Sequence, residues 1–220
     1  MSRLQPWKSG AAALMALTIT TSAVAPMIVS APAEAQFSNQ QRTITIPAGV
    51  TIPVTYEKNK ILVTPTETIS LKLKVASSIV DNSGRVLIPV NTEIVGKLQP
   101  ARRNSVKGSQ FIASELVFPN GERQYINANS QVITRTEKIT KGADTGTIVQ
   151  DAAIGGAAAA VISGITGNRR IAAWKVIGGA GLGSLASLYL RKKEVEVVVI
   201  NPDPDLNITL RSSLPIRSQY

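Results

Sequence analysis

The sequence predicts a mainly β protein with an inserted α-helical hairpin, as a small β-barrel or sandwich that carries a two-helix antenna. Two observations predict this fold. Short β-branched runs separated by turn residues recur along residues 43–136 and return along 194–210. Between them lie two apolar stretches rich in Gly and Ala. Hydrophobic residues make up 44% of the chain but aromatic ones only 4%, so the core has to come from Val, Ile, Leu and Ala.

The first 35 residues have the order of a cleavable export signal. Arg3 and Lys8 precede the apolar or small stretch 11–30, which the A-x-A sequence ending at Ala35 follows. A basic start, an apolar middle and a small-residue cleavage site are the three parts of a secretory signal peptide. We expect cleavage after Ala35 and an exported protein in the periplasm, inserted in or attached to the outer membrane. The alternative is an uncleaved anchor, because the apolar stretch approaches the about 20 residues that span a bilayer.

After a disordered start at 36–42, the first part of the β domain is expected to span residues 43–146. Ile69–Val75 alternates apolar residues with Ser and Lys, which is typical of a strand with one buried face. Pro119-Asn120-Gly121 between two β runs predicts a hairpin. Further strands are expected at 43–46, 50–56, 86–89, 93–98, 109–118, 122–126 and 131–136, with a turn at 81–84.

The insertion at 147–193 is predicted from the spacing of its small residues. Residues four apart share one face of a helix, and a stripe of small residues lets two helix backbones approach closely. We therefore expect helices at 152–167 and 176–190. Their stripes contain the predicted packing and oligomerisation residues Gly155, Gly156, Ala160, Gly164, Gly179, Gly183 and Ser187.

Each predicted helix would be short for a membrane span. About 15 residues give roughly 23 Å of helix, less than the roughly 30 Å hydrocarbon core of a typical bilayer. Such a length suits a thinner bacterial outer membrane better. The alternatives are a hairpin that packs on its own β domain, or strands in a glycine-rich sheet.

The β pattern returns after the insertion. Glu194–Ile200 begins with alternation and becomes fully apolar. A turn is expected at 201–205, and residues 206–210 alternate again. These closing strands of the β domain are expected to end near residue 212. Residues 213–220 are expected to be a loose tail.

Charge and composition limit the function classes. The formal net charge is +10, which fits anionic partners as well as plain solubility. The nearest approach to a basic cluster is Arg102, Arg103 and Lys107, which we expect in an exposed loop, first as solvated side chains and second as a contact surface. The scarcity of aromatic residues argues against nucleic-acid binding by base stacking.

The absence of His and Cys excludes several classes of enzyme. A Ser-His-Asp hydrolase, a Cys-His protease and a His- or Cys-ligated zinc site all need residues that the chain lacks. Paired carboxylates or a Ser-Lys dyad would remain. Candidate acids such as Glu115 and Glu122 lie at ordinary strand or turn positions, where a solvated side chain is expected. We therefore predict no catalytic, cofactor-binding or metal-binding residue.

The order of several short motifs resembles the TrbI-like family, which supplies the scaffold subunit of conjugation and type IV secretion systems. The segments that carry the resemblance are 46–52, 80–89, 92–98, 116–121 and 201–210. Val90-Asn91 departs from it, because the family pattern has Lys-Gly there. The resemblance implies a β-barrel-like domain with a projecting two-helix antenna, which in the family lines a pore through the outer membrane.

Two functions follow from these patterns. The first is a non-enzymatic structural or channel-forming component of the cell envelope, which forms a homo-oligomer through the β domain and the hairpin. Its partners would be the outer membrane and other envelope or secretion subunits. The second is a soluble periplasmic binding or adaptor module whose hairpin packs on its own β domain. If the chain is the oligomeric envelope component, Gly156→Leu and Gly179→Leu are expected to disrupt its assembly.

Overall fold

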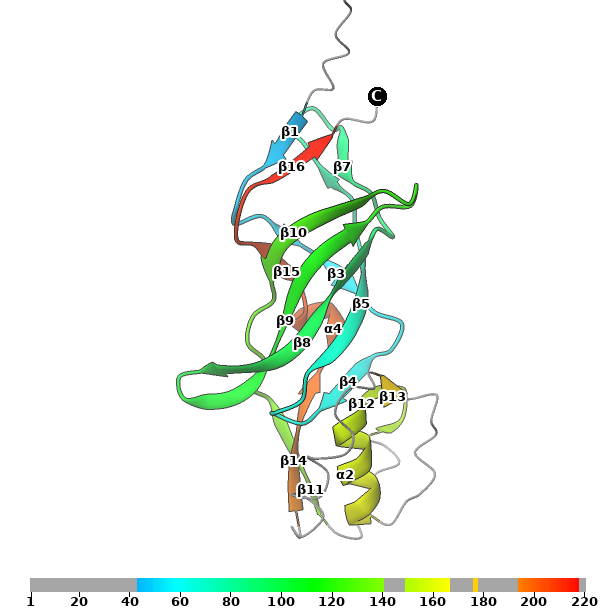
Figure 1. Cartoon of the computed structure of the whole chain (residues 1–220), viewed down its shortest axis with the longest axis vertical. Coiled ribbons are helices and arrows are strands. Elements are labelled where there is room, and N and C mark those ends of the chain that lie inside the picture. The colour runs from blue at the N-terminus through cyan, green and yellow to red at the C-terminus, as the bar shows by residue number, and fades with distance from the viewer. Residues whose placement is uncertain (1–42, 141–148, 167–175, 178–193, 218–220) are drawn as a thin grey trace, which may run out of the picture. The chain divides into compact units, whose positions relative to one another are not determined.

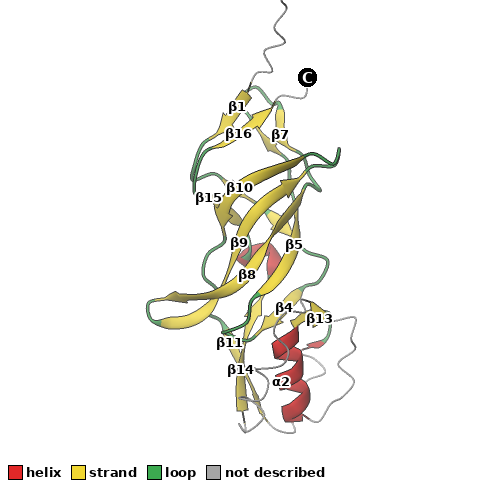
Figure 2. Ribbon diagram, in the orientation of Figure 1, coloured by secondary structure: helices red, strands yellow, loops and turns green. Residues whose placement is uncertain are grey.

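The computed structural model describes residues 43–140, 149–166, 176–177 and 194–217 (Figure 1). This part of the chain is mostly strands, with two helices, α2 (Gly156–Thr166) and α4 (Pro202–Asp205) (Figure 2). The largest sheet is barrel-like and nearly closed. The predicted fold class, mainly β with a helical insert, is therefore confirmed.

A seven-stranded sheet forms the barrel. Its edge strands β2 (Thr51–Ile52) and β3 (Val54–Thr55) are consecutive in the chain and are separated only by Pro53. The backbone N–H of Val54 donates a hydrogen bond of 3.0 Å to the side-chain oxygen of Asn207, which lies just before β15. The sheet therefore curls until its two edges meet. Its strand order is β2, β15 (Ile208–Leu210), β10 (Arg123–Asn129), β9 (Val106–Val117), β8 (Glu93–Arg103), β5 (Ile69–Val75) and β3.

Aliphatic side chains fill the barrel, as the composition requires. The predicted strand Ile69–Val75 is confirmed, with its four apolar residues buried and its Ser and Lys residues exposed. Phe111 is the one aromatic residue among the largest fully buried side chains of the described chain. Phe111 lies against Gly96, where an added Cβ would come within 2.6 Å of the ring. The glycine therefore provides the space that the ring needs.

Strands β8 and β9 form a hairpin longer than the sequence predicted. The expected loop around residues 102–107 is wrong, because Arg102 pairs with Lys107 and Arg103 with Val106. The turn is reduced to Asn104 and Ser105, with φ of 51° and 69°. Two successive residues with positive φ are typical of the tight turns whose twist matches that of the flanking strands. The hairpin thus continues as a two-stranded arm beyond its neighbours (Figure 1).

A second sheet contains the start of the glycine-rich insertion. Its order is β11 (Thr136–Thr140), β14 (Glu194–Ile200), β4 (Lys60–Val63), β12 (Ala152–Gly155) and β13 (Val176–Ile177). The helix predicted from residue 152 is wrong at its first turn, since β12 pairs in parallel with both β4 and β13. Val176 and Ile177 are likewise in a strand rather than a helix. The other residues of the predicted hairpin, 141–148, 167–175 and 178–193, lie outside the described residues.

Two further predictions are corrected at the chain's later segments. The tail is not loose throughout, because β16 (Leu214–Arg217) pairs antiparallel with β1 (Thr43–Ile46). Leu214 and Ile216 are buried, which stabilises this pairing. The strand expected at 131–136 is reduced to a bridge between Ile133 and Ser109.

The predicted hairpin at 119–121 is confirmed, with Phe118 and Glu122 joined by a backbone hydrogen bond of 2.8 Å. The short strands β6 (Ile79–Val80) and β7 (Val86–Ile88) pair with each other.

Candidate assembly site

The structure places four of the seven predicted packing residues. Gly155 ends β12 and Gly156 begins α2, and both are buried. Ala160 is half-buried and Gly164 is exposed. The stripe through Gly156, Ala160 and Gly164 therefore runs from the core to the surface along one helix. Gly179, Gly183 and Ser187 lie outside the described residues.

Helix α2 has a buried face and an outward face that differ in their contacts. Its aliphatic face is buried and packs on β4, β11, β12 and β14. The buried residues are Gly156, Ala157, Ala158, Ala159, Val161, Ile162 and Ile165. The outward face contains Ala160, Ser163 and Gly164. We call these three residues the small face of α2.

Glu67 fixes the start of α2. This residue lies in the turn between β4 and β5, and its side chain is buried. Its carboxylate accepts hydrogen bonds from the backbone N–H of Ala157 at 2.7 Å and of Ala158 at 3.2 Å. It also accepts a bond of 3.2 Å from the N–H of Thr64. A carboxylate satisfies the unpaired N–H groups of a helix N-terminus and interacts favourably with the helix dipole.

Gly155 makes this contact possible. An added Cβ at Gly155 would lie 2.5 Å from Oε2 of Glu67, which is closer than Cβ atoms come to their neighbours in real structures. The small residue therefore has a role within one subunit, besides the helix packing that the sequence predicted. Sequence reasoning missed Glu67. The signal for it was a helix with no acidic residue in its first turn and with two glycines where a capping side chain is usual.

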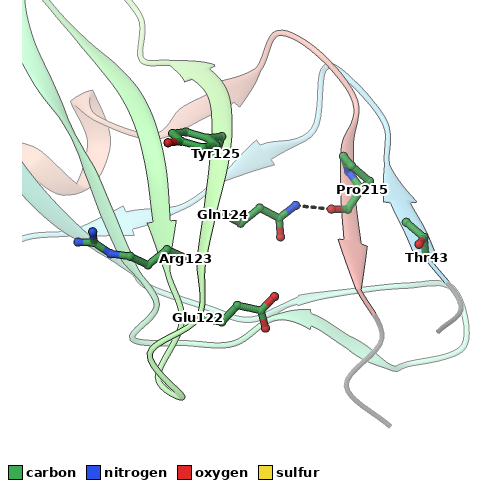
Figure 3. Close-up of a pocket in the computed structure, with 6 residues that line it drawn as sticks. All are labelled: Thr43, Glu122, Arg123, Gln124, Tyr125 and Pro215. Carbon is green, nitrogen blue, oxygen red and sulfur yellow. Dashed lines mark hydrogen bonds between the residues drawn. The ribbon is translucent and has the colours of Figure 1, made fainter. Parts of the chain in front are cut away.

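A shallow groove of about 410 Å³ lies between β10 and the β1–β16 pair (Figure 3). The side chain of Gln124 crosses it and donates a hydrogen bond to the carbonyl oxygen of Pro215. The candidate acid Glu122 lines this groove. The other candidate acid, Glu115, forms an ion pair of 3.6 Å with Arg123. Within the described ranges, no three metal-binding side chains gather in one place.

The three basic residues that the sequence singled out lie at the end of the β8–β9 arm. Residues 102–107 are all exposed, and Val106 keeps 52% of its surface in solvent. We call these six residues the arm tip. Arg102, Arg103 and Lys107 form no ion pair within the part of the chain that the structure describes. The arm tip is therefore a local excess of positive charge.

Neither helix of the described chain combines the length and the apolar character needed to cross a bilayer. No family model and no curated protein matches the sequence. Among solved structures, the chain is similar to ComB10 of the Com type IV secretion system of Helicobacter pylori, with 16% identity. The match covers 77% of this chain and 88% of ComB10, at a TM-score of 0.39. At that score the two chains share too little geometry for the likeness to bear on function.

Proposed function

We propose that this chain is a non-enzymatic structural component of a cell envelope, which oligomerises through its β domain and its glycine-rich insertion. The observation that carries the proposal is the small face of α2. A helix in contact with solvent alone favours polar or long side chains, whereas this face presents Ala160, Ser163 and Gly164. Small residues are the ones that let a second backbone pack closely against a helix.

The attachment of α2 supports the same proposal. The carboxylate of Glu67 and the strand pairing of β12 with β4 hold the start of the helix on the β domain. A helix fixed in this way presents its small face in a defined direction, so a neighbouring subunit meets a preorganised surface. Preorganisation lowers the entropy that association costs. Under this proposal the second sheet and Glu67 position the helix, and the helix makes the contact.

The envelope location is part of the proposal and depends on the predicted signal peptide at residues 1–35. The resemblance to the TrbI-like family points to the same location and remains a prediction. The lack of His and Cys removes the commonest catalytic groups, which favours a structural role over an enzymatic one.

The molar mass of the full chain in solution tests this function. Gly164→Leu places a bulky side chain on the small face without entering the core, because Gly164 is exposed. Gly156→Leu is a poorer test, since Gly156 is buried at the start of α2. Ser70→Leu is the matched control, as it adds the same side chain to an exposed position on β5. We expect an oligomer for the wild type and for Ser70→Leu, and a smaller species for Gly164→Leu.

A second candidate is a periplasmic adaptor module that acts as a monomer. The observation in its favour is that α2 already packs on the sheet of its own chain through β4, β11, β12 and β14. This candidate predicts the mass of one chain at every concentration, and equal masses for Gly164→Leu and the wild type. The same measurement therefore separates the two functions.

A further inference from the structure

We propose that the arm tip, residues 102–107, is a docking element for the anionic headgroups of a lipid bilayer. The first reason is its charge. It contains Arg102, Arg103 and Lys107, and no acidic residue occurs anywhere from 94 to 114. Two cations on the barrel lie 3.6 Å from an acidic side chain, Lys72 from Glu93 and Arg123 from Glu115. The arm tip has the cations without the counter-charges.

The strand register makes this excess costly for an isolated subunit. Arg102 lies directly opposite Lys107 on paired strands. Like charges at directly opposed positions destabilise a strand pair. The turn adds a further cost. Ser105 has a φ of 69°, a backbone conformation that residues other than Gly, Asn and Asp rarely adopt. An anionic partner would relieve the first of these costs.

The two faces of the arm determine how a partner can approach. Arg102 and Lys107 share one face of the ribbon, while Arg103 shares the other with Val106, since neighbouring residues of a strand point to opposite faces. A partner that lay flat on either face would miss at least one cation. A surface that meets the arm end-on contacts all three. A bilayer is such a surface, and a convex arm tip fits it better than it fits a linear polymer.

Val106 favours lipid over other polyanions. It is an aliphatic side chain, 52% exposed, next to the turn and between cations. At a membrane surface an apolar residue enters the headgroup region while neighbouring Lys and Arg side chains bind anionic lipids. Single-stranded nucleic acids are bound by aromatic side chains that stack on bases as well as by cations, and no aromatic residue occurs in the arm tip.

Vesicle cosedimentation of the full chain tests the proposal, with phosphatidylcholine vesicles compared to mixed phosphatidylglycerol–phosphatidylcholine vesicles. The test variant is Arg102→Gln/Arg103→Gln/Lys107→Gln. The control is Lys72→Gln/Lys74→Gln/Lys97→Gln, which removes the same charge from exposed positions on the barrel, Lys72 being the one of the three that pairs with an acid. Each cation near an anionic membrane strengthens binding several-fold, so we expect the arm variant to lose about 100-fold in affinity for the anionic vesicles. The control should lose far less, and added salt should weaken wild-type binding.

A single substitution at Val106 separates insertion into lipid from attraction between charges alone. Val106→Ser should weaken binding several-fold without changing its dependence on salt. Both the triple arm variant and Val106→Ser should unfold at the wild-type temperature or above it, because their side chains are exposed and the triple change removes a repulsion. Three results would each overturn the proposal. They are equal losses of affinity in the two triple variants, wild-type binding by Val106→Ser, and a preference of the arm for heparin over anionic vesicles. Oligomeric mass is measured separately, so this result leaves the proposed function untouched.

Discussion

The carboxylate of Glu67 accepts a hydrogen bond of 2.7 Å from the backbone N–H of Ala157, a residue 90 positions later in the chain. This contact joins the turn before β5 to the first turn of α2. It explains how a helix with no polar side chain of its own at its start can be stable there. The position of the small face of α2 depends on it.

Glu67→Ala is expected to destabilise the protein by about 1–3 kcal/mol. The substitution leaves the buried N–H groups of Ala157, Ala158 and Thr64 without their acceptor. Glu67→Gln should cost less, because the amide keeps one acceptor oxygen. Urea unfolding curves give these free energies. Equal stability of Glu67→Ala and the wild type would show that the contact contributes nothing.

Gly155→Ala should act through the same carboxylate. Its new Cβ would lie 2.5 Å from Oε2 of Glu67, so the carboxylate has to shift from its present position at the helix N-terminus. In a double-mutant cycle, Gly155→Ala is therefore expected to cost much less in the Glu67→Ala background than in the wild type. Additive free energies of unfolding would contradict a direct clash between the two positions.

Gly108→Ala should be among the more destabilising alanine substitutions. The added Cβ would lie 2.1 Å from the backbone carbonyl oxygen of Ile133, which a rotamer change cannot move. Hydrogen bonds between Ser109 and Ile133 hold these segments together at the base of the arm. We expect a loss of about 2–3 kcal/mol, whereas Ser70→Ala on the exposed face of β5 should stay within about 0.5 kcal/mol. Thermal unfolding of the two variants compares them directly.

The turn at Asp81 should have an unusual pH dependence. Hydrogen bonds from the Ser83 hydroxyl and then from the Arg85 guanidinium hold the pKa of the Asp81 carboxyl well below its usual range. Because the folded-state pKa is the lower one, the stabilisation is present above the unfolded-state pKa of about 3.9 and is lost as the pH falls through the folded-state pKa. Ser83→Ala should raise the pKa of Asp81. Carboxyl chemical shifts followed by NMR against pH measure it, and an unchanged titration would refute the assignment.

Sequence alone predicted the strands whose burial follows a simple period. Ile69–Val75 and Glu194–Ile200 have strand bounds identical to those expected. The first strand buries one face, and the second buries all four residues at its C-terminal end, so apolar residues mark both strands in the sequence. The ends of the β8–β9 arm were missed because both faces of the ribbon meet solvent there, so no alternation of apolar residues marks them. Strand β16 was missed because it contains Pro215, which usually argues against a strand.

The insertion shows where local patterns fail. Ala152–Gly155 fits a stripe of small residues on a helix as well as it fits a buried strand. The strand forms because β4 and β13 provide parallel partners from distant parts of the chain.

At Asn91, in contrast, the local motif agrees with the backbone that the structure shows. Asn91 adopts a φ of 64°, which explains why a glycine would serve at the same place in the motif that the sequence resembles.

Photo-crosslinking from position 164 shows whether the small face of α2 lies against a second subunit. The chain has no cysteine, so Gly164→Cys gives one attachment point on the small face of α2, and Ser70→Cys gives a control on the barrel surface. With a thiol-linked photoactivatable group, we expect covalent two-chain adducts from position 164 and few from position 70. Reaction from position 164 that stays within single chains, at concentrations where the wild type is an oligomer, would contradict it.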